Sequence, residues 1–218
     1  MKHDPIKTNV LSARVIARAS SFLLSALNTP DGLTSLGLIT TDCDDVSYAA
    51  LDEATKKAAV QVVYARSLYA GAANATGRLA GEFIGIIAGN NPAEVRSGLD
   101  AALAFIRQDA CFYSADEEDR IVYFAHCISR SGSYLSAQAG VAEGSPLAYL
   151  IASPLEALYA LDQAMKAADV EMKLFYGPPT ETNFAGALLT GDQSACKAAC
   201  EAFAEAVCQV GDSPLIEP

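Results

Sequence analysis

Three carboxylates stand beside apolar segments of the chain, where they could act together. Asp44 and Asp45 lie just after one apolar segment, and Glu82 begins another. Carboxylates gathered at strand ends can bind a cation or an amine, or can act as a general acid and a general base. A simpler interpretation is that Asp44 or Asp45 caps a following helix. The residues alone leave these interpretations open.

The charge of the whole chain indicates which ligand such carboxylates would accept. The 218 residues carry a formal net charge of −11, with 15 Lys and Arg against 26 Asp and Glu. Binding of a nucleic acid depends on Lys and Arg that neutralise phosphates, so this composition argues against a nucleic-acid partner. A small cation or an amine is electrostatically easier to accept than an anion.

Other reactive residue types predict little chemistry. His126 and Cys127 are neighbours in a strand-like run, so their side chains point to opposite faces and cannot form a catalytic pair. The acidic run at 116–119 lacks the flanking ligand pattern of a metal site and is typical of a solvated turn. The six cysteines include no C-x-x-C pair. Among these residues we therefore expect no catalytic residue and no metal site.

Short strands alternate with helices and must position the carboxylates. The expected strands are residues 9–20, 35–40, 60–65, 82–88, 120–130, 147–152, 170–176 and 185–189. The expected helices are residues 46–57, 91–106, 154–168 and 194–210. Several short strands in a row, mixed with helices, favour an α+β, ferredoxin-like unit over a doubly wound sheet.

The two halves of the chain are copies of one module. The run ALDEATKKA at 50–58 returns as ALDQAMKAA at 160–168, and residues 95–101 match 196–202. We therefore expect two domains, at 1–109 and 110–218. Cys196 and Cys200 take the places of two apolar residues of the first copy, so we expect them in the core.

The carboxylates are where the copies differ. Asp44 and Asp45 align with Pro154 and Leu155, and Glu82 is placed opposite Ala187. The shared residues are expected to build the module, and the unshared ones to carry its function. The repeated Asp52 and Lys56, like Asp162 and Lys166, are spaced for surface ion pairs on a helix.

Several motifs together resemble the bacterial microcompartment (BMC) shell domain. They are LGLI at 36–39, DCDDV at 42–46, VYARSLYAGA at 63–72, NPAEVR at 91–96, RSGSYL at 130–135, ALDQAMKAADV at 160–170 and PPTETN at 178–183. With two such modules, the chain resembles the tandem-domain shell proteins of ethanolamine-utilisation microcompartments, essentially from end to end.

The resemblance implies an α+β fold of two tandem, circularly permuted, ferredoxin-like BMC domains. Three chains would form a trimeric pseudohexamer, a tile that packs edge to edge with other shell proteins. Lys56 and Lys166 are the candidates for these lateral contacts. The implied role is structural and not enzymatic, in the shell of a microcompartment in the bacterial cytoplasm. The N-terminus predicts no secretory signal, and no segment predicts a membrane span.

The resemblance also implies two kinds of pore. Ethanolamine, a cation at neutral pH, would bind at a small pore within each subunit, through Asp44, Asp45, Glu82 and the aromatic Phe112. A gated central pore would pass substrates or cofactors. Its loops are expected to contain Leu68, Tyr69, Ala70, Gly71, Ala72, Thr180, Glu181, Thr182 and Asn183. No cofactor is required, but relatives bind cobalamin at this pore, and Tyr69 is the expected plug.

Two other classes of function stay open at this point. A small-molecule-processing enzyme could use Asp45 and Glu82 as general acid and base. A soluble amine sensor could use the same residues to bind its ligand without forming any assembly. Flat sheets of protein would distinguish a shell tile from both.

Overall fold

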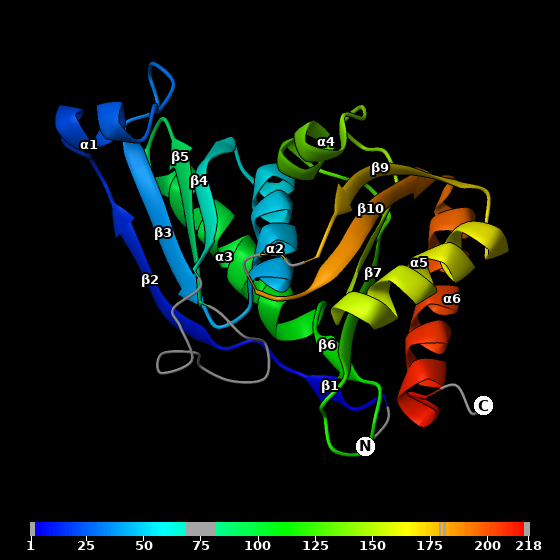
Figure 1. Ribbon diagram of the computed structural model, residues 1–218. Coiled ribbons are helices and arrows are strands. Elements are labelled where there is room, and N and C mark those ends of the chain that lie inside the picture. Colours follow the sequence, from blue (N-terminus) through cyan, green and yellow to red (C-terminus); the bar gives the residue numbers. More distant parts are fainter. Residues whose placement is uncertain (1–2, 69–81, 179, 181, 216–218) are drawn as a thin grey trace. The chain divides into compact units, whose positions relative to one another are not determined.

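The computed structural model describes residues 3–68, 82–178, 180 and 182–215 (Figure 1). The chain divides into two compact units. Unit 1 comprises Met1–Lys7, Cys111–Ser131 and Gln138–Pro218, and unit 2 comprises Thr8–Ala110 and Gly132–Ala137. The junction at Ala110 lies beside the expected domain boundary, and each unit also takes one short segment from the other half of the chain.

Unit 2 is built on a four-stranded antiparallel sheet in the order β2-β3-β5-β4. Its strands are β2 (Val10–Ile16), β3 (Ser35–Thr41), β4 (Val60–Leu68) and β5 (Glu82–Gly89). Its helices are α1 (Ser21–Ala26), α2 (Asp44–Lys57) and α3 (Pro92–Gln108). Helix α3 approaches β3 closely, because a Cβ on Gly37 would lie 2.8 Å from Val95 and 2.9 Å from Leu99. The glycine therefore admits the buried face of the helix.

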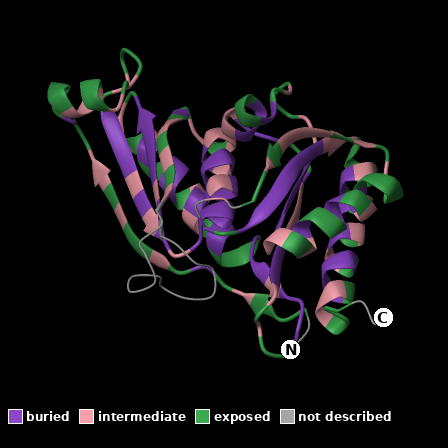
Figure 2. Cartoon of the chain, viewed as in Figure 1, coloured by how far each residue is buried: buried purple, intermediate pink, exposed green. Residues whose placement is uncertain are grey.

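Unit 1 contains a six-stranded sheet in the order β1-β6-β7-β8-β10-β9. Its strands are β1 (Pro5–Ile6), β6 (Phe112–Ser114), β7 (Val122–Ile128), β8 (Leu147–Ala152), β9 (Val170–Tyr176) and β10 (Ala185–Gly191). Helices α5 (Pro154–Ala167) and α6 (Gln193–Asp212) pack on it through an alanine-rich core. Helix α4 (Ser133–Ala139) begins in unit 2. Strand β8 is buried along its whole length and β10 along most of it (Figure 2).

The expected α+β class and the duplication are confirmed. The order β2-α1-β3-α2-β4-β5-α3 returns as β7-α4-β8-α5-β9-β10-α6. Cys196 and Cys200 are buried in α6, as expected from the repeat. The sequence prediction missed α1, α4, β1 and β6, all of which have seven residues or fewer.

The strand register corrects one alignment between the copies. Phe83 pairs with Thr41, the last residue of β3, whereas Ala185 pairs with Ala152, the last residue of β8. Glu82 therefore corresponds to Phe184, and its alignment with Ala187 is wrong. Short apolar strands resemble one another in several registers, and only the hydrogen-bonded ladder selects one of them.

Candidate functional site

Asp44 lies in a hydrogen-bonded group at the start of α2. Its carboxylate accepts a hydrogen bond from the Ser67 hydroxyl of β4 (2.6 Å), and that hydroxyl lies 2.8 Å from the Tyr48 hydroxyl. The other carboxylate oxygen of Asp44 accepts the backbone N–H of Asp45 (2.9 Å). Both aspartates are buried, with 6% of each exposed. The start of α2 thus buries two carboxylates, and Ser67 holds that of Asp44 against β4.

Neither aspartate is the cap of the helix, so that interpretation is wrong. The N-cap is Cys43, and Asp44 and Asp45 occupy the first turn of α2. The Cys43 carbonyl accepts hydrogen bonds from Thr41 Oγ1 (2.8 Å) and Ser47 Oγ (2.6 Å). The positive end of the helix dipole favours negative charge in this first turn, without any side-chain cap.

Burial raises the pKa of Asp44 above its ordinary value. The hydrogen bonds from Ser67 and from the start of the helix lower the pKa of Asp44, but burial has the larger effect. A carboxylate that has lost its water is stabilised when a cation comes to it. A charged amine beside Asp44 would therefore stabilise the ionised carboxylate, which is costly to bury alone.

The register of β4 and β5 gives the place of the Glu82 backbone in unit 2. Leu68 pairs with Glu82, and the preceding residue Ser67 pairs with Phe83. Ser67 is the residue that donates to Asp44. The backbone of Glu82 is therefore one residue away from the paired residues Ser67 and Phe83, and Ser67 is bonded to Asp44 at the start of α2.

Phe112 belongs to unit 1, in β6. Its side chain is only 1% exposed, and its ring centroid lies 5.4 Å from that of Phe124 and 5.7 Å from that of Phe184. The ring is a member of an aromatic cluster. The burial of the Phe112 ring could not be predicted from the sequence, because Phe124 and Phe184 are distant from it along the chain.

The expected central-pore loops are described only in part. Leu68 ends β4, whereas Tyr69, Ala70, Gly71, Ala72 and Glu181 lie outside the described residues. In the second loop, Thr180 Oγ1 accepts the Phe184 N–H (3.1 Å) and the Thr180 carbonyl accepts the Asn183 N–H (3.1 Å). Asn183 has a φ of 63°, and Thr182 is buried. Thr180 is thus hydrogen-bonded to both Asn183 and Phe184.

The two repeated Asp and Lys pairs differ in the structure. Lys166 Nζ lies 2.6 Å from an exposed Asp162, so the surface pair expected on α5 is confirmed. Asp52 is different, because its side chain is buried and accepts the backbone N–H groups of Gly132 (2.7 Å) and Leu135 (2.8 Å). The expectation of a simple surface pair is wrong there. Lys56 contacts Asp52 at 3.8 Å and Glu53 more closely.

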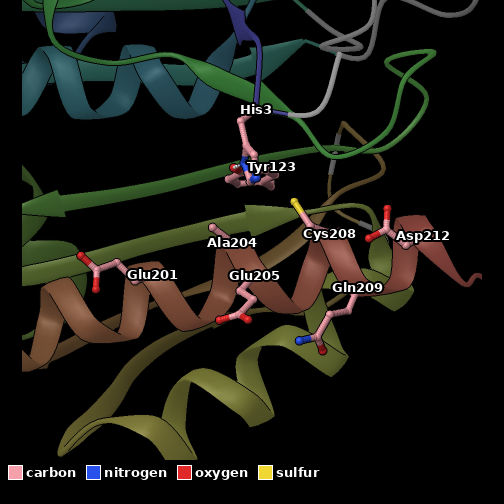
Figure 3. Close-up of a pocket in the computed structure, with 8 residues that line it drawn as sticks. All are labelled: His3, Tyr123, Glu201, Ala204, Glu205, Cys208, Gln209 and Asp212. Carbon is pink, nitrogen blue, oxygen red and sulfur yellow. Dashed lines mark hydrogen bonds between the residues drawn. The ribbon is translucent and has the colours of Figure 1, made fainter.

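A separate hollow in unit 1 has a volume of about 490 Å³ (Figure 3). Its lining residues are His3, Tyr123, Glu201, Ala204, Glu205, Cys208, Gln209 and Asp212. His3 Nδ1 lies 3.0 Å from the Tyr123 hydroxyl, above helix α6. None of the expected site residues lines this hollow, so it does not belong to the group around Asp44.

The described residues contain neither a metal-binding cluster nor a helix that could span a membrane. Within residues 3–68, 82–178, 180 and 182–215, His, Cys, Asp and Glu form no group of three or more that could hold a metal ion. In the same part of the chain, no helix has the length and apolar character needed to cross a membrane.

Comparison with known proteins gives consistent matches. The BMC domain model matches residues 35–116 and 151–217. The bacterial microcompartment shell protein EutL of Clostridium perfringens is 64% identical over 215 residues, which is 99% of each chain. EutL of Salmonella typhimurium is 51% identical over 212 residues, 97% of each chain. The crystal structure of EutL from Leptotrichia buccalis has a TM-score of 0.95 and 61% identity, with full coverage of both chains.

Proposed function

The chain belongs to the BMC domain family, as a tandem-domain shell protein of the EutL type, and from this premise we propose how it assembles and what it binds. Its role is structural: it is a microcompartment shell protein and not an enzyme. We propose that three chains form a tile, in which six BMC units surround a gated central pore. The duplication supports this proposal, because three chains with two similar units each can close a pseudohexagonal ring.

The second part of the proposal is that ethanolamine binds at Asp44, Asp45 and Glu82. The observation that carries it is the pair of buried aspartates at the start of α2, of which Asp44 is bonded to Ser67 of β4, the strand that pairs with β5, where Glu82 is the first residue. One of these carboxylates can neutralise an ammonium group, and the others can accept its hydrogen bonds. Phe112 belongs to unit 1, where its ring packs against Phe124 and Phe184, so the proposal rests on the three carboxylates of unit 2 alone.

Passage of cofactors through the central pore, and cobalamin binding there, remain expectations from the family resemblance. Most of the first pore loop, residues 69–72, lies outside the described part of the chain. A direct test is equilibrium dialysis of cobalamin against the assembled protein and against a Tyr69→Ala variant. Binding to the wild type with altered retention by the variant would support the proposal, and no binding to either would remove cobalamin from it.

Calorimetric titration with ethanolamine at neutral pH tests the amine site. Glu82→Gln and Asp45→Asn each remove one negative charge while keeping the shape of the side chain. We expect each variant to bind ethanolamine at least about 10-fold more weakly, because a charge-assisted hydrogen bond contributes about 1.5 to 3 kcal/mol. Ethylene glycol, which is neutral, should bind to none of the proteins.

The matched control is Asp100→Asn, which removes an exposed carboxylate from α3 of the same unit. It should bind ethanolamine as the wild type does. Equal affinity of the wild type and Glu82→Gln would exclude Glu82 from the site. Equal affinity of all four proteins would show that the amine binds elsewhere.

A further inference from the structure

Helix α4 is seated on α2 by an unusual set of contacts. Asp52 of α2 accepts the backbone N–H groups of Gly132 and Leu135, and Thr55 Oγ1 accepts that of Ser133 (3.1 Å). The Tyr134 ring stacks on Tyr48, with centroids 6.3 Å apart and an interplanar angle of 20°. All of these residues belong to unit 2. One face of α2, with Tyr48, Asp52 and Thr55, thus forms a seat for the start of α4.

The duplication supplies a second copy of both partners. The run RSGSYL at 130–135 corresponds to RASSFL at 18–23, which begins α1, so Phe22 takes the place of Tyr134. Helix α5 corresponds to α2, and its residues in the places of Tyr48, Asp52 and Thr55 are Leu158, Asp162 and Met165. The chain therefore carries one such contact, between α4 and α2, and a second pair of corresponding surfaces, on α1 and α5.

The second set of surfaces is exposed in the single chain (Figure 2). Phe22 is 83% exposed, and α1 has no buried residue. On α5, Leu155 is 64%, Leu158 45% and Met165 43% exposed. Leu155, Leu158 and Met165 lie on one face of the helix, and we call them the outer face of α5. An aromatic ring and an apolar helix face left in water are typical of an interface.

A second copy of this chain is the partner that fits both surfaces. The filled seat shows that a segment with the pattern of α4 fits a helix with the pattern of α2, and only another copy is certain to offer the matching pair. Each chain then places its α1 on α5 of one neighbour and receives α1 of another neighbour on its own α5. Such head-to-tail contacts can close into a ring.

The second contact differs from the first in one respect. A Cβ on Gly132 would lie 2.5 Å from the carbonyl oxygen of Asp52, so the first contact requires glycine. The corresponding Ser20 has a Cβ and caps α1 itself, by accepting the Leu23 N–H. The second contact must therefore be less close at the backbone, and Phe22 must supply most of its buried area.

We propose that Phe22 of α1 in one copy docks on the outer face of α5 in a second copy, as Tyr134 of α4 docks on α2. This inference rests on the proposed assembly and adds which two surfaces meet in it. The contact is apolar, with an aromatic ring against Leu155, Leu158 and Met165.

Sedimentation velocity over a concentration series, with the full chain, tests the proposal. Phe22→Asp and Leu158→Asp each place a charge in the contact from opposite sides. We expect each variant to raise the concentration at which the assembly dissociates by at least about 30-fold, the ratio for a hot-spot loss of about 2 kcal/mol. Leu215→Asp changes an exposed leucine outside both surfaces and should assemble as the wild type does.

Mixing the two variants gives a sharper result. Phe22→Asp keeps an intact α5 and Leu158→Asp keeps an intact α1, so one good contact remains available between them. At a concentration at which each variant alone is monomeric, we expect the equimolar mixture to form a dimer that grows no further. Circular dichroism checks the fold of each variant, and Phe22→Ser and Leu158→Ser replace any that fails to fold.

The outcomes separate this proposal from the proposed assembly. A wild type that stays monomeric at every concentration would overturn the assembly, and the docking with it. A wild type that assembles while both variants assemble equally well would overturn the docking of Phe22 on α5 and leave the assembly in place. Single variants that dissociate but form no dimer on mixing would also overturn it.

Discussion

Replacing Asp52 by Ala is expected to lower the free energy of unfolding by about 3 kcal/mol, because two buried backbone N–H groups then lose their acceptor. These groups belong to Gly132 and Leu135, at 2.7 and 2.8 Å from the carboxylate. Both are buried, so water cannot replace the lost hydrogen bonds without opening the contact. Urea unfolding followed by circular dichroism measures the difference.

Asp52→Asn should fall between Ala and the wild type. The amide offers one oxygen to one N–H, but its NH₂ group faces the other N–H as a second donor. Asp100→Ala is the control, since Asp100 is exposed on α3 of the same unit, and we expect it to change stability by less than about 0.5 kcal/mol. Equal effects of Asp52→Ala and Asp100→Ala would contradict the seat of α4 on α2.

Asp44→Asn is expected to raise stability at neutral pH while it weakens ethanolamine binding at least about 100-fold, an affinity loss of about 2.7 kcal/mol. Burial raises the pKa of Asp44, so the folded chain bears a cost for the ionised carboxyl. The amide removes this cost, and it can still accept the Asp45 N–H and bond to Ser67. A site that costs stability in its empty state is typical of a binding site.

The pH dependence of this effect has a definite sign. Because the folded pKa of Asp44 lies above the unfolded value, the folded chain holds the proton over a range in which the unfolded chain has lost it. The stability of the wild type therefore falls as pH rises from the ordinary carboxyl pKa through the raised one. The advantage of Asp44→Asn should be absent in acid, grow across this range and be complete at neutral pH.

Thermal unfolding of both proteins across this pH range, together with calorimetric titration, measures the two effects. Asp100→Asn again serves as the control and should change neither quantity. A variant Asp44→Asn that binds ethanolamine as well as the wild type does would remove Asp44 from the site. A variant less stable than the wild type at neutral pH would show that the ionised carboxylate stabilises the start of α2.

Much of the fold could be predicted because the chain repeats itself. The burial of Cys196 and Cys200 followed from their alignment with Val95 and Leu99, which are also buried. The long elements followed from periodic apolar residues. Short elements such as α1 and β6 carry too few residues for such a pattern, and tertiary contacts decide them.

The candidate site could be predicted only in part. Asp44 and Asp45 stand out in the sequence because their counterparts, Pro154 and Leu155, carry no charge. Their burial, the link through Ser67 and the closed environment of the Phe112 ring depend on strands that are distant in the sequence. The role of Asp52 was missed for the same reason, since its partners Gly132 and Leu135 lie in the other half of the chain.

Negative-stain electron microscopy of the purified protein tests the central claim, that this chain builds a shell tile, most directly. We predict flat sheets of hexagonally packed particles, each with the threefold symmetry of three two-unit chains. Lys166 is exposed on α5, so Lys166→Asp should leave single tiles while reducing the growth of sheets. Dispersed monomers under all conditions, with neither tiles nor sheets, would contradict the account.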